Sequence, residues 1–276
     1  MIQIEILDKN GDVRTGRNEY DEHPLQMAAV GQDRVCLATQ ELIYDPGDFI
    51  RVTTDAPGRH LMVKLSETLD TTLIYLSDMV WEYTIPLAEG DAASLCDGAF
   101  ASRAHYISAR YAKDYEIEQY RNLSLNPHDQ RDCANAFPHA SANVETRNDS
   151  TFFAKNAIDG NIANNSHGPY PYQSWGINRD PNAKLKIDFG REVCVDSVCF
   201  TFRADFPHDS YWTQVSLGFS DGSSFDFMTE KTADGQIFNF APIVTSYVVF
   251  ENLIKADDES PFPALTQIEV YGAEIN

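Results

Sequence analysis

The sequence predicts an all-β protein made of two β-sandwich domains of the jelly-roll type. Three features predict this class: apolar and polar residues alternate in short segments, turn-forming residues separate those segments, and helical periodicity is confined to short stretches. Closely spaced strands without intervening helices pair in antiparallel sandwiches or jelly rolls. A chain of 276 residues is long enough for two such domains.

In the first half, the alternation begins at once, because Ile2, Ile4 and Ile6 lie on one face of a predicted strand. Further strands are predicted at residues 49–53, 61–65, 71–76 and 80–85, and the Asp-Pro-Gly-Asp sequence at 45–48 is a turn. Residues 101–104 favour a helix, whereas residues 105–111 favour a strand.

In the second half, strands are predicted at residues 185–189, 198–202, 215–219, 225–227, 247–250 and 268–271, and Gly190 ends the first of them. Residues 122–149 are rich in Asn, Asp, Pro and Ser and show little periodicity, which indicates a long loop or linker. The domain boundary is therefore placed at its start, with a first domain at 1–121 and a second at 122–276.

Charge limits the partners that the chain can bind. The formal net charge is -21, with 42 acidic against 21 basic residues. Nucleic acids and anionic membranes require a basic footprint, so neither is expected as a partner. Neutral ligands and metal cations remain open.

Location and redox state follow from what the sequence contains. No apolar run approaches the roughly 20 residues that span a bilayer, and the first residues lack the basic and apolar regions of a signal peptide. A cytoplasmic location is therefore expected. The five cysteines form an odd set without a metal-type C-x-x-C spacing, so we expect reduced and mostly buried thiols.

Short motifs follow one another in a defined order from residue 122 onward. They are NLSLN at 122–126, SAN at 141–143, AIDGN at 157–161, LKIDFG at 185–190, FSDG at 219–222 and IEVYG at 268–272. Their order resembles the discoidin, or coagulation factor five/eight type C, family, which includes galactose-binding-like carbohydrate-binding modules. The resemblance implies an eight-stranded jelly roll that binds glycans through loops at one end. It covers rather more than half of the chain, and the first half resembles no identified family.

The resemblance also implies a structural calcium ion. In that family an Asp-Gly-Asn loop and a Glu of the last strand hold the metal, which nominates Asp159 and Glu269, with a backbone carbonyl near Asn156 and with Asn161 or Asn164. Hard oxygen ligands of this kind suit Ca2+. This chain departs from the family at Asn164, where Ser or Thr is usual, and in the inserted residues 166–172. The alternative is that Asp159 and Gly160 form a plain turn and that Glu269 is a solvated strand residue.

A glycan site is predicted on two loops that flank the central strands. A sugar ring requires an aromatic platform and rigid, planar hydrogen-bonding groups around it. The platform is assigned to Tyr170, Tyr172, Tyr211 and Trp212, and the polar groups are assigned to His167, Gln173, Arg203, Asp205 and His208.

Each of these assignments has a structural alternative. Arg203 and Asp205 could equally form an ion pair that only stabilises the loop. Trp175 and Trp81 are expected in the core, because large aromatic side chains are usually buried. His128 and His139 are expected on the surface.

The function that the sequence favours is carbohydrate binding without intrinsic catalysis. The chain has no nucleophile elbow, zinc-protease helix motif or phosphate-binding glycine loop. Its acidic residues are so numerous that paired carboxylates carry little information about glycosidase chemistry. Two alternatives remain open: an uncharacterised glycoside hydrolase or polysaccharide lyase, and a homo-oligomeric scaffold protein.

Overall fold

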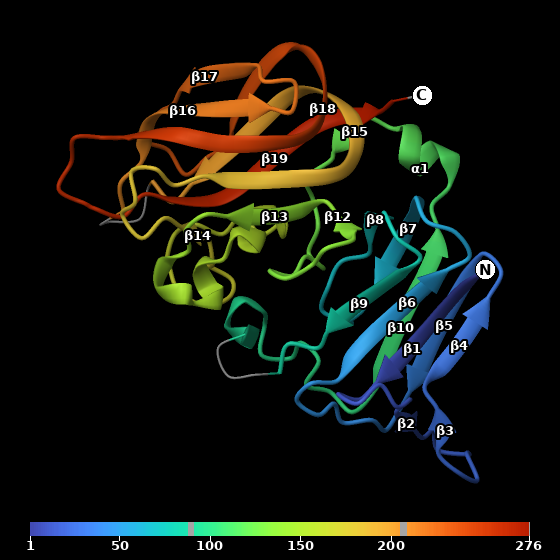
Figure 1. Cartoon of the computed structure of the whole chain (residues 1–276). Coiled ribbons are helices and arrows are strands. Elements are labelled where there is room, and N and C mark those ends of the chain that lie inside the picture. Colours follow the sequence, from blue (N-terminus) through green and yellow to red (C-terminus); the bar gives the residue numbers. More distant parts are fainter. Residues whose placement is uncertain (88–90, 205–208, 276) are drawn as a thin grey trace.

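The structure is a computed structural model that describes residues 1–87, 91–204 and 209–275, and almost all of its regular structure is β-strand (Figure 1). The predicted all-β class is confirmed. The one α-helix of the described residues is α1 (Asp114–Glu118). Short 3-10 helices occupy η1 (Asp91–Ser94), η2 (Thr146–Asn148), η3 (Ser150–Phe152) and η4 (Ala154–Ile158).

The first unit consists of two antiparallel sheets. One has the order β4-β1-β6-β9, the other has the order β12-β8-β7-β10-β5, and β2 pairs with β3 outside both. The strands are β1 (Ile2–Leu7), β2 (Thr15–Gly16), β3 (Leu25–Gln26), β4 (Ala28–Gly31), β5 (Arg34–Thr39), β6 (Phe49–Thr54), β7 (Arg59–Lys64), β8 (Thr72–Leu76), β9 (Val80–Thr84), β10 (His105–Tyr111) and β12 (Ala136–Phe137).

One hydrophobic core joins these two sheets. Ile4 and Trp81 of the first sheet and Val63 and Ile107 of the second belong to the same buried cluster. The alternation of period two in the sequence places these side chains inward, because successive residues of a strand point to opposite faces. Burial of each such side chain contributes roughly 1.5–3 kcal/mol to folding.

The second unit is one long sheet that folds over on itself. The strand order is β11-β19-β15-β18-β16-β17, while β13 pairs with β15 and β14 pairs with β19. The strands are β11 (Arg121–Asn122), β13 (His139–Ala142), β14 (Trp175–Gly176), β15 (Leu185–Phe202), β16 (Trp212–Phe219), β17 (Ser224–Met228), β18 (Gln236–Lys255) and β19 (Ala264–Glu274).

A bend at Gly190 lets β15 serve both layers of this sheet. The prediction that Gly190 ends a strand is wrong, since β15 continues through it. The register with β18 shifts twice in this region, between Asp188 and Val193 and between Val195 and Ser197. Gly190 has φ +68°, which side chains rarely adopt, and a Cβ there would collide with the ring of Phe137. The glycine therefore permits a sharp change of direction, and the ladder between β15 and β18 is interrupted there, from Asp188 to Val193, before it resumes.

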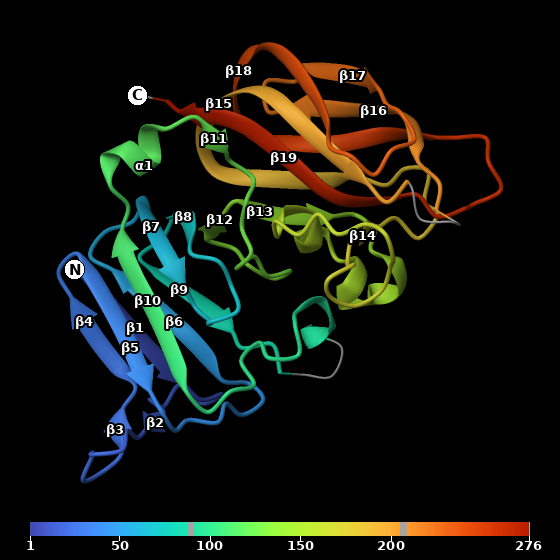
Figure 2. The same cartoon turned by 180° about the vertical axis from the view of Figure 1, so that it is seen from behind.

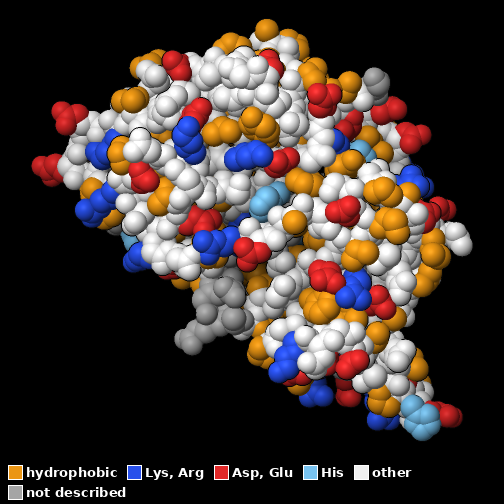
Figure 3. All heavy atoms as spheres, in the orientation of Figure 1, with side chains coloured by type: hydrophobic (Ala, Val, Ile, Leu, Met, Phe, Trp, Pro, Cys, Tyr) orange, Lys and Arg blue, Asp and Glu red, His pale blue; other side chains and the backbone are white. Residues whose placement is uncertain are grey.

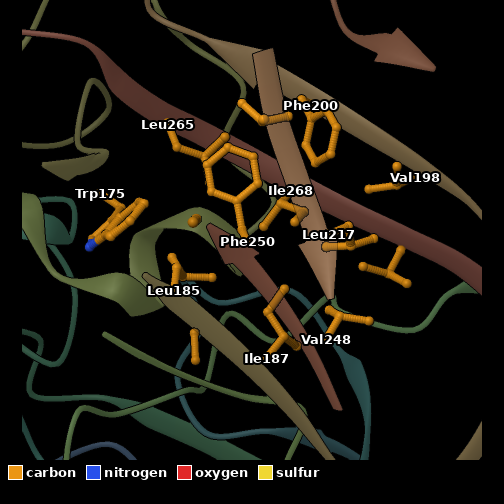
Figure 4. Packing of buried hydrophobic residues seen from close by; sticks show 14 of the residues in the cluster. Trp175, Leu185, Ile187, Val198, Phe200, Leu217, Val248, Phe250, Leu265 and Ile268 are labelled. Carbon is orange, nitrogen blue, oxygen red and sulfur yellow. The ribbon is translucent and has the colours of Figure 1, made fainter. Parts of the chain in front are cut away.

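The aromatic core of the second unit lies between the layers (Figure 4). Phe200 and Phe250 lie near its centre with ring centroids 5.2 Å apart, and Trp175 meets Phe250 edge-on at 6.3 Å. Trp175 and Trp81 are buried, which confirms that part of the prediction.

The chain crosses between the two units more than once (Figure 2). The predicted boundary after residue 121 falls within β11, which pairs with β19 of the second unit. The chain then returns, because β12 pairs with β8 of the first unit. The segment 122–149, predicted as a linker, thus contributes one strand to each unit through β12 and β13.

Charged groups from both units meet at Glu274. Its carboxylate accepts hydrogen bonds from Arg121 at 2.6 Å and from Arg191 Nε at 2.8 Å, and His60 Nε2 of the first unit lies 3.4 Å away. Arg191 also stacks over the ring of Tyr75 at 4.8 Å. Glu274 therefore joins β7 of the first unit to β15 and β19 of the second.

Other local predictions differ from the structure. Residues 101–104 form turns and bends instead of a helix. All five cysteines are free, as expected, but only Cys199 is buried and Cys36 is exposed.

No helix among the described residues is long and apolar enough to cross a membrane. On the face seen in Figure 3, acidic side chains are spread over the surface instead of gathered in one patch.

Candidate ligand-binding site

Trp212 is not a surface platform. Its side chain is fully buried, and its ring meets Phe202 at 5.3 Å and Phe250 at 5.7 Å, both edge-on. The pairing of β16 with β18 shifts register on both sides of Gln214. Such irregularities re-aim side chains, and here Trp212 faces the same core as Val215. The prediction that this indole binds a sugar is wrong.

The other predicted platform residues do not form one surface. Tyr211 is half-buried and packs against the core of the second unit. Tyr172 is also half-buried. Tyr170 is exposed and lines a separate cavity of about 200 Å³, and its backbone N–H donates to the carbonyl of Ala93 in the first unit at 2.9 Å. Two of the predicted polar residues, Asp205 and His208, lie outside the described residues.

Arg203 forms a buried ion pair with Asp209. The two side chains are 3% and 4% exposed, and Arg203 Nη2 lies 2.9 Å from Asp209 Oδ2. Arg203 Nη1 also donates to Ser174 Oγ at 3.1 Å. Desolvation lowers the pKa of Arg203, and the charge of Asp209 opposes that shift. The buried partner is thus Asp209, and the pairing of Arg203 with Asp205 stays a prediction.

This ion pair lies against an open pocket of about 490 Å³ at the edge of the second unit. The buried part of its lining includes Arg203, Asp209 and Gly176, whereas Arg179, Phe262 and several other lining residues are exposed. Of the predicted ligand residues, His167 and Arg203 lie here. We call this cavity the rim pocket; further residues that line it are Thr146, Arg147, Phe152, Ile177, Asn178, Pro261, Pro263 and Ala264.

Close packing around Gly176 shapes one wall of the rim pocket. A Cβ at Gly176 would lie 2.7 Å from Thr146 Oγ1 and 3.1 Å from a ring carbon of Phe152. Thr146 Oγ1 accepts a hydrogen bond from the backbone N–H of Asn178 at 2.9 Å. These contacts hold η2 and η3 against β14 and fix that wall.

Two arginines stack on aromatic rings at the pocket. Arg147 lies over Phe152 with 5.3 Å from the guanidinium carbon to the ring centroid, and Arg179 lies over Phe262 at 4.5 Å. Phe262 is 48% exposed. A large aromatic side chain in that state is available to a ligand.

Sequence reasoning missed Phe262, Arg147 and Arg179. Phe262 stands between Pro261 and Pro263, and a proline on each side stiffens the loop that presents the ring. That sequence was a usable signal for Phe262. No comparable signal marked the two arginines, because their stacking partners are set by the fold.

The residues around Asp159 do not fit a calcium ion. Asp159 Oδ2 accepts from Gln173 Nε2 at 2.7 Å, and Oδ1 accepts from Gln267 Nε2 at 2.7 Å and from the backbone N–H of Asn161 at 2.8 Å. Desolvation raises the pKa of Asp159, and these hydrogen bonds oppose the shift. The carboxylate is surrounded by N–H donors, whereas a cation requires oxygen ligands.

The remaining predicted metal ligands have other partners. The Asn156 carbonyl accepts from Gln267 Nε2 at 2.6 Å. Asn164 Nδ2 donates to the carbonyls of Phe202 and Ala233 at 3.2 and 2.6 Å. Glu269 accepts from Tyr271 Oη at 3.0 Å. No group of three or more His, Cys, Asp or Glu within the described part of the chain could hold a metal ion.

Of the two histidines expected on the surface, one is buried and the other is half-buried. His128 is 1% exposed, and its Nε2 accepts the backbone N–H of Leu65 at 3.2 Å. Burial lowers the pKa of His128 to about 3. His139 is half-buried and its Nδ1 lies 2.8 Å from Asp129 Oδ1. The expectation of a surface position is therefore wrong for His128, and His139 is partly covered and paired with Asp129.

A larger cleft of about 830 Å³ lies at this junction. Its lining mixes polar and apolar residues, and the aromatic residues among its described lining, Tyr83 and Phe153, are buried. Asp129, which also lines it, accepts from His139 and from the backbone N–H of Ala140 at 2.8 Å. The cleft thus lacks the exposed aromatic ring that the rim pocket has in Phe262.

No protein-family model matches the chain, and no curated protein matches it. Solved structures with a similar arrangement include a chitosan-binding module of a chitosanase/glucanase from Paenibacillus sp. IK-5. The match has 17% sequence identity and a TM-score of 0.38, and it covers 55% of this chain and 98% of that module. A family 32 carbohydrate-binding module of C. perfringens NanJ, in complex with galactose, has 21% identity over 48% of this chain and 91% of its own, with a TM-score of 0.37.

A fucose-binding module of Streptococcus pneumoniae has 14% identity, covering 55% of this chain and 98% of its own with a TM-score of 0.40. Similarity at this level identifies no ligand for the present chain.

Proposed function

We propose that the chain binds a carbohydrate in the rim pocket and does so without intrinsic catalysis. The observation that carries the proposal is the exposed ring of Phe262 in the same pocket as the buried pair of Arg203 and Asp209. A pyranose ring has an apolar C–H face and a rim of hydroxyl groups. It therefore requires an aromatic surface and rigid polar groups in one place.

The polar groups of the pocket meet this requirement because they are held in place. The bond from Arg203 to Ser174 and the ion pair with Asp209 orient both side chains before a ligand arrives. A guanidinium donates through several N–H groups and a carboxylate accepts, so together they suit neighbouring sugar hydroxyls. The volume of about 490 Å³ is in the range of small-molecule sites.

Binding is favoured over hydrolysis by the carboxylates of the pocket. Glycoside hydrolysis commonly uses two carboxyl groups at a separation of roughly 5–10 Å. Asp209 is the one carboxylate among the described residues that line the rim pocket, and it pairs with Arg203. The nearby Asp258 accepts from Lys255 Nζ at 2.8 Å and from Ser210 Oγ at 2.7 Å.

The test is a glycan array followed by calorimetric titration of the glycans that bind. We expect Phe262→Ala to weaken binding by about tenfold, the effect of losing an aromatic contact of 1–2 kcal/mol. Tyr20→Ala is the matched control, because Tyr20 is 90% exposed and does not line the pocket. An array without any binding, or equal affinity in wild type and Phe262→Ala, would contradict the proposal. Turnover of chromogenic glycosides would contradict the absence of catalysis.

A further inference from the structure

The charge of the rim pocket is opposite to that of the chain. The whole sequence has two acidic residues for each basic one, with 42 against 21. Among the described residues that line the pocket, three arginines and His167 accompany one carboxylate, that of Asp209. Such a reversal in a single concave site marks it as a place for negative charge.

Arg179 and Arg147 supply that positive charge. Arg203 is balanced by Asp209 at 2.9 Å. Arg147 lies 3.7 Å from Asp149, but both side chains are largely solvated at 68% and 37% exposure, so this pair contributes little. Arg179 is exposed and forms no ion pair with a carboxylate of the described residues.

Stacking orients both guanidinium groups for recognition of an anion. The guanidinium carbons of Arg147 and Arg179 lie over the rings of Phe152 and Phe262, 5.3 and 4.5 Å from the ring centroids. A guanidinium that stacks through its face keeps its N–H groups at the edge, where a carboxylate or sulfate can accept two hydrogen bonds in parallel.

The backbone at both arginines is held in an unfavourable conformation. Arg147 has φ +55° and Arg179 has φ +61°, and their neighbours Asn148 and Asn178 have φ +52° and +48°. Only two other described residues apart from glycine, Phe100 and Asn252, have positive φ. Each such residue costs roughly 1 kcal/mol or more, and strain of this kind concentrates at ligand sites. The two loops thus place the arginines at the pocket at a cost in stability.

We infer that the ligand of the rim pocket is an acidic sugar, one that carries a carboxylate or sulfate group. This inference rests on the proposed glycan-binding function. The acidic group lies between Arg147 and Arg179, while the hydroxyls of the ring meet Arg203 and Asp209. Long polyanions are disfavoured, because the whole chain has a formal net charge of -21. A short oligosaccharide avoids that repulsion, since physiological salt screens charges beyond about 8 Å.

The test uses glycans in matched acidic and neutral forms. Uronic-acid oligosaccharides are compared with their methyl esters, sialylated glycans with their asialo forms, and sulfated galactosides with their desulfated forms. We expect at least one acidic member to bind about tenfold more tightly than its neutral partner, as charge-assisted hydrogen bonds allow. The difference should shrink as sodium chloride rises from 50 to 300 mM. Comparing the carboxylate glycans with the sulfated glycans shows which of the two acidic groups the pocket prefers.

Arg179→Gln should weaken binding of the acidic form more than binding of its neutral partner, so that the ratio of the two affinities falls from about tenfold toward one. Arg51→Gln is the matched control, because Arg51 also stacks on a ring, that of Phe49 at 5.4 Å, and does not line the pocket. Equal binding of neutral and acidic forms would overturn this inference while glycan binding itself stands. Failure of every glycan to bind would overturn both proposals.

Discussion

The side-chain nitrogen of Gln267 lies 2.7 Å from Oδ1 of Asp159 and donates a hydrogen bond to it. The same nitrogen lies 2.6 Å from the backbone oxygen of Asn156, and Gln267 Oε1 accepts from the backbone N–H of Gly160 at 3.1 Å. The Asp159 carboxylate and the Asn156 carbonyl, which both accept from Gln267, are oxygens that a calcium ion would require as ligands. An uncharged amide therefore links the loop at Asp159 to β19.

From this arrangement we expect the stability of the protein to be independent of calcium. Excess chelator should change the melting temperature by less than about 2 °C, which corresponds to under 1 kcal/mol for a domain of this size. Differential scanning fluorimetry with chelator and with 5 mM calcium chloride measures this. Gln267→Glu is the informative variant, because it places a second carboxylate beside Asp159 and should lower the melting temperature without metal. A drop of several degrees when chelator is added to the wild type would refute the expectation.

Trp212→Ala should destabilise the fold without a direct effect on the ligand. Removing a fully buried tryptophan from contact with Phe202 and Phe250 creates a cavity that costs roughly 3–5 kcal/mol. Urea denaturation measures that loss. In titrations below the onset of unfolding, affinity per folded molecule should match the wild type. A variant that keeps its stability but loses binding would restore the indole as a ligand platform.

Arg203→Met should cost roughly 3–5 kcal/mol of stability, because it removes the cation that lies 2.9 Å from the buried carboxylate of Asp209. The double variant Arg203→Met with Asp209→Leu should recover part of the loss, since the uncompensated charge is then gone. Arg179→Gln is the exposed control and should change the free energy of unfolding by under about 0.5 kcal/mol. If the single and double variants are equally stable, the uncompensated charge of Asp209 is not what destabilises the single variant.

Because of His128, the free energy of unfolding should decrease as the pH falls below 6.5. Its pKa is about 3 in the folded chain against 6.5 ordinarily, so between these values only the unfolded chain binds the proton. Stability should therefore be fully present above pH 6.5 and fall by roughly 1 kcal/mol for each pH unit below it. Protonation is unfavourable because the imidazole is buried away from water and lies near the positive charge of Lys64. Urea denaturation of wild type and His128→Gln from pH 7 to 4.5 should show a shallower slope in the variant; parallel slopes would exclude this histidine.

Glu274→Gln should weaken the contact between the two units. Its carboxylate is 9% exposed and lies among Arg121, Arg191 and His60, so its neutralisation leaves two arginines without a nearby counter-charge and costs roughly 3 kcal/mol. Glu82→Gln is the matched control, because Glu82 pairs with Arg51 at the surface with 51% exposure. Calorimetry compares the two variants. Equal, small losses would mean that the cluster at Glu274 behaves like a surface pair.

The strands were readable because alternation is a local property. Successive residues of a strand point to opposite faces, so the alternation of Ile2, Ile4 and Ile6 with polar residues marks the face that points inward. The same kind of alternation predicted β7, β8, β9 and β10. The first half of β18 was not predicted, because it carries exposed residues such as Ile237 and Val244 among its partly buried ones. A strand with that mixture has no clear apolar face for sequence analysis to detect.

The sequence by itself determined the class of fold and most of the turns between strands. Only the tertiary structure decided which of the candidate side chains line the rim pocket and which are buried in the core. Trp212 is turned into the core by shifts in strand register, Gln267 meets Asp159 from 108 residues away, and Phe262, Arg179 and Arg203 come together from three separate segments. The physical reason is that alternation fixes the side of a strand locally, whereas the neighbours of a side chain depend on pairing and packing between distant segments.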